Sequence, residues 1–108
     1  MLTGKSLLAY AGSVGDVFKA LADPTRRKIL VELAEQDGQT LFGLCSRLAA
    51  VHQLAMTRQA ISQHLEVLED AGLVSTRREG RYKFHDLNTG PLETLTDPWV
   101  KRPRKEEA

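Results

Sequence analysis

Residues 57–87, with the sequence TRQAISQHLEVLEDAGLVSTRREGRYKFHDL, decide the fold, because a helical pattern passes here directly into a hairpin pattern. Thr57 is a favourable N-cap, since its hydroxyl can accept a hydrogen bond from a free backbone N–H of the first turn. Gly72 can adopt the left-handed conformation that often ends a helix. Between them the apolar residues recur at helical spacing, at Ala60, Ile61, Leu65 and Leu68. The first half of the stretch therefore predicts a helix over residues 57–70.

The second half of the stretch predicts a β-hairpin. Strands are expected over residues 74–78 and 81–85, with the turn at Glu79-Gly80, because glycine tolerates the positive φ of a tight turn. In the second strand two aromatic residues, Tyr82 and Phe84, alternate with polar ones. Successive strand residues point to opposite faces. We therefore expect the aromatic face to pack on the helices and the other face to stay basic.

Three further helices are expected before this stretch. The first carries an apolar stripe and ends near Asp23, and the second begins at Pro24 and stops at Asp37-Gly38. Thr40 caps the third, and His52 to Met56 are expected to form the connecting turn, within a connection over 49–56 that is longer than a tight turn needs. The stripe of the first helix consists of Val14, Val17, Phe18 and Leu21, and that of the third consists of Leu41, Leu44, Cys45, Leu48 and Ala49.

A last short helix is expected at Pro91, Leu92 and Leu95, before Pro98 breaks the pattern. The order of these expected helices and strands along the chain predicts a mainly α fold of the α+β class. This fold is a winged helix-turn-helix with about five helices and a two-stranded β-hairpin wing. A chain of 108 residues has room for one such domain, expected over residues 13–99. We expect residues 1–12 to be an N-terminal extension that is able to continue the first helix, and residues 100–108 to be a disordered tail.

The composition narrows the class of protein. Hydrophobic residues make up 42% and charged residues 27% of the chain, as in an ordinary soluble globular protein. There is neither a glycine-rich phosphate loop nor a nucleophile with an evident base, so we expect no enzyme and no cofactor. No segment reaches the roughly 20 apolar residues of a membrane helix. We expect a cytoplasmic protein without a membrane partner.

Cys45 is the only cysteine, which excludes an intramolecular disulfide and a zinc site built from several thiolates of one chain. On the apolar face of a helix it fits the role of a small buried hydrophobe, with redox or metal sensing as the alternative. His52 lies seven residues further on, about 10 Å along a continuous helix and too far for both to bind one ion. We therefore expect no metal site.

The solvent face of the helix over residues 57–70 carries hydrogen-bonding side chains without a dominant charge. Amide, hydroxyl and guanidinium groups of this kind can read base edges in the major groove. We expect base readout by Arg58, Gln59, Ser62 and Gln63. Thr57 and His64 are further candidates for DNA contact, although His64, at the edge of the apolar side, is equally suited to packing. The acidic residues Glu66, Glu69 and Asp70 follow in later turns and are expected to point away from the phosphates.

The hairpin concentrates positive charge, since its four basic residues stand against the single acid Glu79 and give a local charge of +3. Such a cluster beside a base-reading helix favours contacts to DNA phosphates. The expected phosphate-binding residues are Arg77, Arg78, Arg81 and Lys83, with Arg78 and Arg81 nearest the tip. The run from Arg26 to Lys28 has two open interpretations, a solvated helix face or a second phosphate contact.

Three ordered motifs carry a resemblance to a known family. FKALADPTRRKIL at residues 18–30, RQAISQHLEVLEDAGLV at 58–74 and RREGRYKFHDL at 77–87 resemble the arsenical-repressor (ArsR-type) winged-helix regulators. The resemblance implies a homodimer joined through the first and last helices, whose candidate interface residues are Val14, Val17, Phe18, Leu92, Leu95 and Trp99. Many members of the family are released from DNA by a metal or another effector. Here the helix before the turn has only Cys45 and the last helix has no histidine, so the effector stays unassigned.

These observations predict a sequence-specific DNA-binding regulator of transcription. The expected partners are double-stranded DNA and a second copy of the chain, with repression by promoter occupancy as the expected outcome. Two symmetric reading helices would bind an imperfectly palindromic operator. The alternative is a winged-helix module in which the same polar helix face binds a partner protein instead of DNA.

Overall fold

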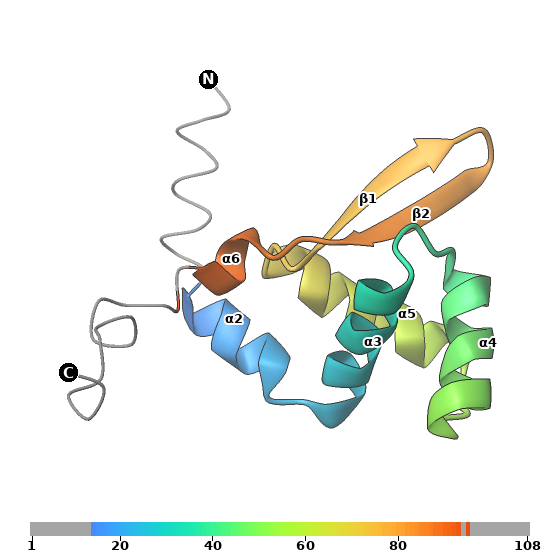
Figure 1. Ribbon diagram of the computed structural model, residues 1–108, viewed down its shortest axis with the longest axis horizontal. Coiled ribbons are helices and arrows are strands. Elements are labelled where there is room, and N and C mark those ends of the chain that lie inside the picture. Colours follow the sequence, from blue (N-terminus) through green and yellow to red (C-terminus); the bar gives the residue numbers. More distant parts are fainter. Residues whose placement is uncertain (1–13, 94, 96–108) are drawn as a thin grey trace, which may run out of the picture.

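The computed structural model describes residues 14–93 and 95 of the chain, which form five helices and one hairpin (Figure 1). The expected extension 1–12, the expected tail 100–108 and the candidate interface residue Trp99 lie outside the described residues. The helices are α2 (Val14–Leu21), α3 (Pro24–Glu35), α4 (Leu41–His52), α5 (Arg58–Asp70) and α6 (Gly90–Glu93), and the strands are β1 (Val74–Glu79) and β2 (Tyr82–Leu87). The winged helix-turn-helix architecture predicted from the sequence is confirmed.

Local capping explains where three of the helices begin. Side-chain oxygens of Asp23, Thr40 and Thr57 accept hydrogen bonds from the backbone N–H groups three residues further on, at 3.0, 3.1 and 3.1 Å. Each bond satisfies one of the donors that a helix leaves free in its first turn. At the end of α5, Gly72 has φ +80° and allows the chain to leave the helix, as expected.

The connection between α4 and α5 lies close to the turn expected at His52 to Met56, and it is shorter than the long connection expected over 49–56. Helix α4 continues through His52, and Gln53 then adopts a left-handed conformation with φ 52°. The backbone N–H of Leu54 donates to the carbonyl oxygen of Leu48 at 3.0 Å, which satisfies an acceptor in the last turn of α4. The turn of the helix-turn-helix therefore spans only residues 53–57.

The hairpin differs from the expectation in register. β1 and β2 pair antiparallel up to Glu79 opposite Tyr82, so the two-residue turn is Gly80-Arg81, not Glu79-Gly80, and Gly80 supplies the positive φ of +64°. The strands are accordingly 74–79 and 82–87 rather than 74–78 and 81–85.

The expected orientation of the hairpin is wrong, because its aromatic face points outward. Tyr82 is 59% exposed, whereas His85 is buried. The inner face is fixed at the base of the hairpin, where Val74 is buried opposite the half-buried Leu87. His85 lies on this same face, and its backbone exchanges hydrogen bonds with Gln39 at 2.9 and 3.1 Å. The link ties the wing to the loop between α3 and α4.

The core lies where α2, α3, α4 and α5 meet beneath the base of the wing. Figure 1 shows α3 between α2 and α4, with the wing extending beyond the helices. Helix α6 contacts α2 near the first described residue. The buried side chains include Val17, Ile29, Leu33, Leu44, Leu48, Ile61, Leu65, Leu68 and Leu73. Within the described part of the chain, no helix has the length and apolar character needed to span a bilayer.

Candidate nucleic-acid interface

The exposed face of α5 brings together the four residues expected to read bases. Arg58, Gln59 and Gln63 are exposed and Ser62 is half-buried. All four line one open hollow of about 540 Å³, together with Leu41 and Glu66. The apolar face of α5 lies in the core through Ile61, Leu65 and Leu68, which fixes the direction in which the polar face looks. A rigid helix thus presents donors and acceptors to the outside.

The two further candidates on this helix have partners within the protein. Thr57 is the N-cap, and its hydroxyl oxygen accepts from the N–H of Ala60. His64 lies on the side of α5 that meets α3, where Arg26 Nη1 donates to His64 Nδ1 at 3.2 Å. Asp23 Oδ2 is 3.9 Å from the same nitrogen. The geometry gives His64 a role in joining α5 to α3.

The four basic residues of the wing are not equivalent. Arg77 donates from Nε to Asp86 at 3.0 Å and from Nη1 to Glu79 at 2.7 Å, and its guanidinium lies 4.9 Å from the centre of the Phe84 ring. It also lies against the loop before α4, since a β-carbon added to Gly38 would be 2.8 Å from its Nη2. The charge of Arg77 is therefore compensated within the wing by Asp86 and Glu79.

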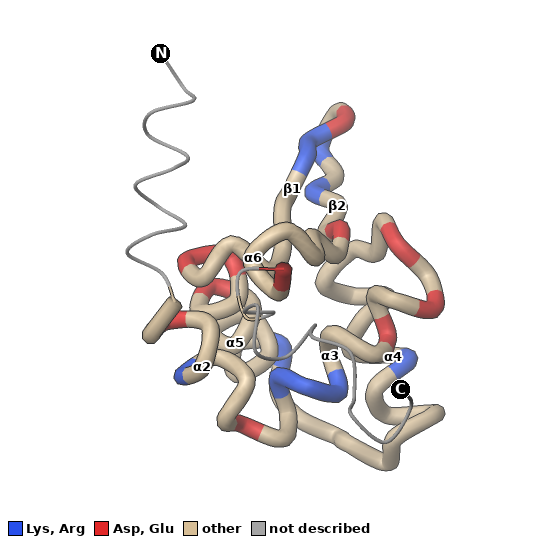
Figure 2. The backbone as a smooth tube through the Cα atoms, turned by 60° about the vertical axis from the view of Figure 1, so that its left-hand side comes forward, with Lys and Arg blue, Asp and Glu red and all other residues tan. Residues whose placement is uncertain are grey.

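Lys83 is also partnered, because its Nζ lies 3.7 Å from Glu69 Oε2 of α5. Arg78 and Arg81 are exposed, and neither forms a salt bridge with the residues described in the structure. Figure 2 shows how the basic positions gather towards the end of the wing. Of the expected phosphate-binding residues, Arg78 and Arg81 are thus the two whose charges are available to DNA.

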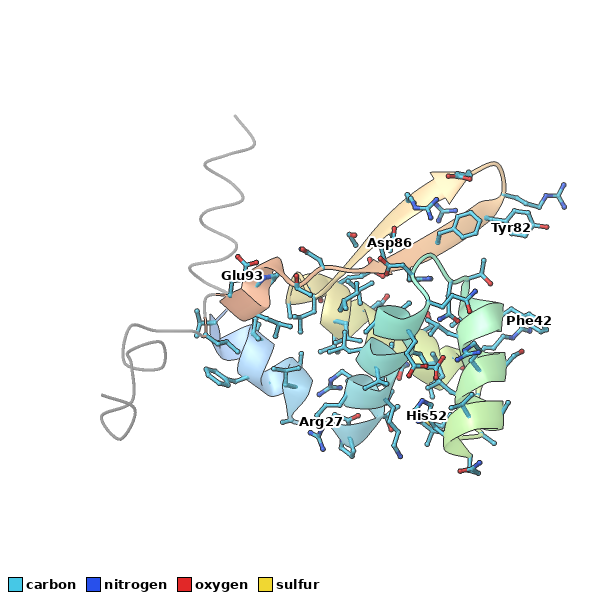
Figure 3. The ribbon with its side chains drawn as sticks, viewed as in Figure 1. Arg27, Phe42, His52, Tyr82, Asp86 and Glu93 are labelled. Carbon is cyan, nitrogen blue, oxygen red and sulfur yellow. The ribbon has the colours of Figure 1, made fainter. Side chains whose placement is uncertain are left out.

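The run at Arg26 and Arg27 has a third role that the sequence did not suggest. Arg26 donates to the carbonyl oxygens of Ala20 and Lys19 at 2.8 and 3.1 Å, and Arg27 donates to that of Leu21 at 2.6 Å. These carbonyls end α2 and have no partner within the helix. Figure 3 shows Arg27 at the junction of α2 and α3. Both arginines therefore fix the angle between the two helices.

The sequence pattern also did not predict a buried carboxylate, Glu32, between α3 and α4. Glu32 of α3 has no exposed surface, and its two oxygens accept from Arg47 Nε and, at 2.9 Å, from His52 Nε2. Both donors belong to α4, and Figure 3 shows His52 between the two helices. The hydrogen bond from Arg47 holds the pKa of the Glu32 carboxyl below its ordinary value. The only signal in the sequence was a charged residue next to Leu33 on the apolar stripe of α3.

Cys45 matches its structural interpretation. The thiol is half-buried on α4, and burial raises its pKa, against a smaller opposing effect of the nearby Arg58 charge. Among residues 14–93 and 95, no three histidine, cysteine, aspartate or glutamate side chains gather closely enough to hold a metal ion.

The described candidate interface residues between chains divide into three groups by exposure. Val17 has no exposed surface within the single chain, so it belongs to the core and cannot meet a partner. Phe18 is 59% exposed, a large apolar side chain without cover on α2. Val14, Leu92 and Leu95 are half-buried, and both leucines pack against the core. Among the described interface candidates, Phe18 thus has the most area left to bury.

Comparison with known proteins agrees with this geometry. Residues 21–77 match the family described as a helix-turn-helix domain. An uncharacterized HTH-type transcriptional regulator of Bacillus subtilis, YuzN, is 48% identical over 90 residues, which are 83% of this chain and 98% of that protein. The arsenical resistance operon repressor of the same organism is 37% identical over 78 residues, 72% of this chain and 69% of the repressor.

A solved structure extends the match to three dimensions. The homodimeric winged helix-turn-helix DNA-binding domain of a possible ArsR-family transcriptional regulator from Mycobacterium bovis superposes with a TM-score of 0.61. It is 27% identical, and the match covers 85% of this chain and 77% of that one. Fold, motifs and relatives agree, and the chain belongs to the ArsR family of winged helix-turn-helix transcriptional regulators.

Proposed function

We propose that the chain is a dimeric repressor that binds a specific DNA sequence through α5 and grips the flanking backbone with its wing. The observation that carries this proposal is the gathering of four hydrogen-bonding side chains, Arg58, Gln59, Ser62 and Gln63, around one open hollow on α5. A major groove about 12 Å wide accepts a helix of this kind, and side-chain amides, hydroxyls and guanidinium groups distinguish its base pairs.

The wing supplies the part of the affinity that does not depend on sequence. Arg78 and Arg81, which form no salt bridge with the described residues, suit phosphate oxygens, and Arg81 lines a cavity together with Ser62 and Glu66 of the reading helix. Contacts of this kind set the position of the protein on the duplex, while contacts from α5 choose the sequence. The two surfaces together give a regulator that finds DNA through charge and its operator through hydrogen bonds.

The dimer is supported by the homodimeric description of the mycobacterial domain and by the exposed Phe18 on α2. Pairing through α2 and the last helix would bury this side chain, together with the half-buried Val14, Leu92 and Leu95. A two-fold dimer places two reading helices on half-sites about one helical turn, or roughly 34 Å, apart. The operator is therefore an imperfect palindrome.

Repression is supported by the name of the Bacillus subtilis relative, the arsenical resistance operon repressor. A dimer seated on a promoter blocks access to it without any chemical step. The family and the fold are those of transcriptional regulators. A protein with this task works where the chromosome is accessible, which agrees with the expected cytoplasmic location.

The stoichiometry on DNA tests this proposal. Sedimentation of the chain with duplexes from the region upstream of its own gene should give two chains on a duplex that carries the full palindrome. A duplex with one half-site should bind at least about tenfold more weakly, because only one reading helix finds its site. One chain per duplex, with equal affinity for both duplexes, would contradict the dimeric mode of binding.

A further inference from the structure

Glu66 of α5 is an exposed carboxylate on the reading face of the helix. It follows Ser62 by four residues and Gln63 by three, so it lies on the same side, about 6 Å and about 4.5 Å further along the axis. The structure confirms this placement, because Glu66 lines the same hollow as the four expected readout residues. The structure thus groups Glu66 with the expected readout residues, whereas the sequence had grouped it with the later acids that were expected to point away from the phosphates.

Glu66 also lies at the boundary between the reading face and the wing. It lines a second cavity of about 320 Å³ between α5, the first turn of α4 and the wing, whose rim includes Phe42, Tyr82 and Arg81. Figure 3 shows Phe42 and Tyr82 on the two sides of this region, one on α4 and one on the wing. DNA that contacts both α5 and the wing must pass Glu66.

The charge of Glu66 has no compensating partner among the described residues. Glu69, one turn further along α5, pairs with Lys83 at 3.7 Å, whereas no salt bridge within residues 14–93 and 95 includes Glu66. Glu66 is exposed and lies opposite the buried face of the helix, so the fold gains nothing evident from its carboxylate. We therefore explain the position of the Glu66 carboxylate by a role in DNA binding.

A lone carboxylate facing DNA weakens binding to every sequence, because the phosphates repel it. The repulsion is offset where a base presents a hydrogen-bond donor in the major groove. Cytosine does so with its N4 amino group, and glutamate is suited to accept from it. A group that is penalised everywhere except at one base raises specificity at the expense of overall affinity.

We propose that Glu66 is a specificity-determining residue, which selects a C·G pair in each half-site by accepting from cytosine N4 and disfavours all other sequences. The inference rests on the proposed function, since it assumes that α5 enters the major groove. Glu66 would then read one further base pair in each half-site, next to those read by Ser62 and Gln63, and this pair would be C·G.

Selection of binding sites from a pool of random duplex DNA tests the proposal with three variants. The unmodified chain should yield a consensus with one cytosine position per half-site. Glu66→Gln should move the preference at that position to adenine, because an amide pairs with adenine N6 and N7. Glu66→Ala should lose about tenfold of the preference there and bind random duplexes more tightly at low salt. Glu69→Gln, the matched control, should leave the consensus unchanged.

Two outcomes separate the inference from the function on which it rests. If Glu66→Gln and Glu66→Ala select the same consensus as the unmodified chain, with the same base frequencies, the role of Glu66 is overturned while the function stands. If the unmodified chain selects no consensus at all, the proposed sequence-specific function is overturned. Thermal unfolding of the exposed-site variants should match that of the unmodified chain, so a loss of binding cannot come from misfolding.

Discussion

Removing the charges of Arg78 and Arg81 should reduce the salt dependence of DNA binding. These side chains are exposed and form no ion pair within the described residues, so their charges are free to replace counterions on phosphates. Each phosphate contact contributes about 0.9 to the slope of log K against log salt. The double change Arg78→Ala with Arg81→Ala should therefore lower the slope by about 1.8 per wing, or about 3.6 for a dimer with both wings on DNA.

Arg77→Ala provides the matched control on the same strand. Its guanidinium is held by Asp86 and Glu79 and stacks over Phe84, so it releases few counterions when DNA binds. We expect Arg77→Ala to leave the slope near its original value, although it disturbs the orientation of the wing.

Fluorescence anisotropy with a labelled duplex, measured from about 50 to 200 mM salt, gives these slopes directly. Over this fourfold range, a change of 1.8 in slope corresponds to about a twelvefold difference in the loss of affinity, and the change of about 3.6 expected for the dimer corresponds to about 150-fold. An unchanged slope in the double variant would refute the assignment of these arginines to phosphates. A drop for Arg77→Ala of about half that of the double variant would show that the ion pairs within the wing do not persist on DNA.

Three further changes test the other parts of the account. Gln63→Ala should cost about 1–3 kcal/mol on the operator, and an equal loss on scrambled DNA would exclude direct readout. Glu32→Gln should lower the free energy of unfolding by about 2–3 kcal/mol at neutral pH, measured by urea unfolding. Because the folded-state pKa of Glu32 is lowered, the contribution of its carboxylate to stability is complete above the ordinary value of 4.5 and is lost as the pH falls below it. The free energy of unfolding of Glu32→Gln should therefore fall less steeply in acid than that of the unmodified chain. Parallel pH profiles of the two proteins would contradict this. Phe18→Glu should raise the dimer dissociation constant, measured by sedimentation, at least about tenfold. The matched control Val31→Glu, at an exposed position on α3, should leave this constant unchanged. Equal effects of the two changes would show that Phe18 is not part of the dimer interface.

The helices could be predicted because their signals are local. The caps at Asp23, Thr40 and Thr57 depend on a side chain and a backbone N–H three residues apart, and the sequence contains both. The apolar stripes repeat every three or four residues, so the core face of α5 also followed from the sequence. The four expected readout residues came together because they occupy the side of α5 that the core face leaves exposed.

The missed features depend on contacts between distant segments. Glu32 is buried because Arg47 and His52, 15 and 20 residues away, supply its hydrogen bonds. The hairpin turned its aromatic residues outward because its backbone pairs at His85 with Gln39, 46 residues earlier. Aromatic composition alone did not indicate this orientation, since strand alternation gives two faces but not which of them meets the helices.

Glu66 was misjudged for a different reason. It was grouped with Glu69 and Asp70 in later turns that were expected to point away from the phosphates, although its spacing from Ser62 and Gln63 placed it on their side of the helix. The structure shows Glu66 around the same hollow as those two residues. A repelled group in a reading surface is a means of discrimination rather than a contradiction.

The ratio of affinities for operator and scrambled DNA tests the central claim most directly. Duplexes from the region upstream of the chain's own gene, and scrambled duplexes of the same composition, are titrated with the unmodified chain at physiological salt. The account predicts binding to the operator at least about 1,000-fold tighter, as expected for a specific protein–DNA interface. Equal affinity for the two duplexes, or no binding to either, would contradict it.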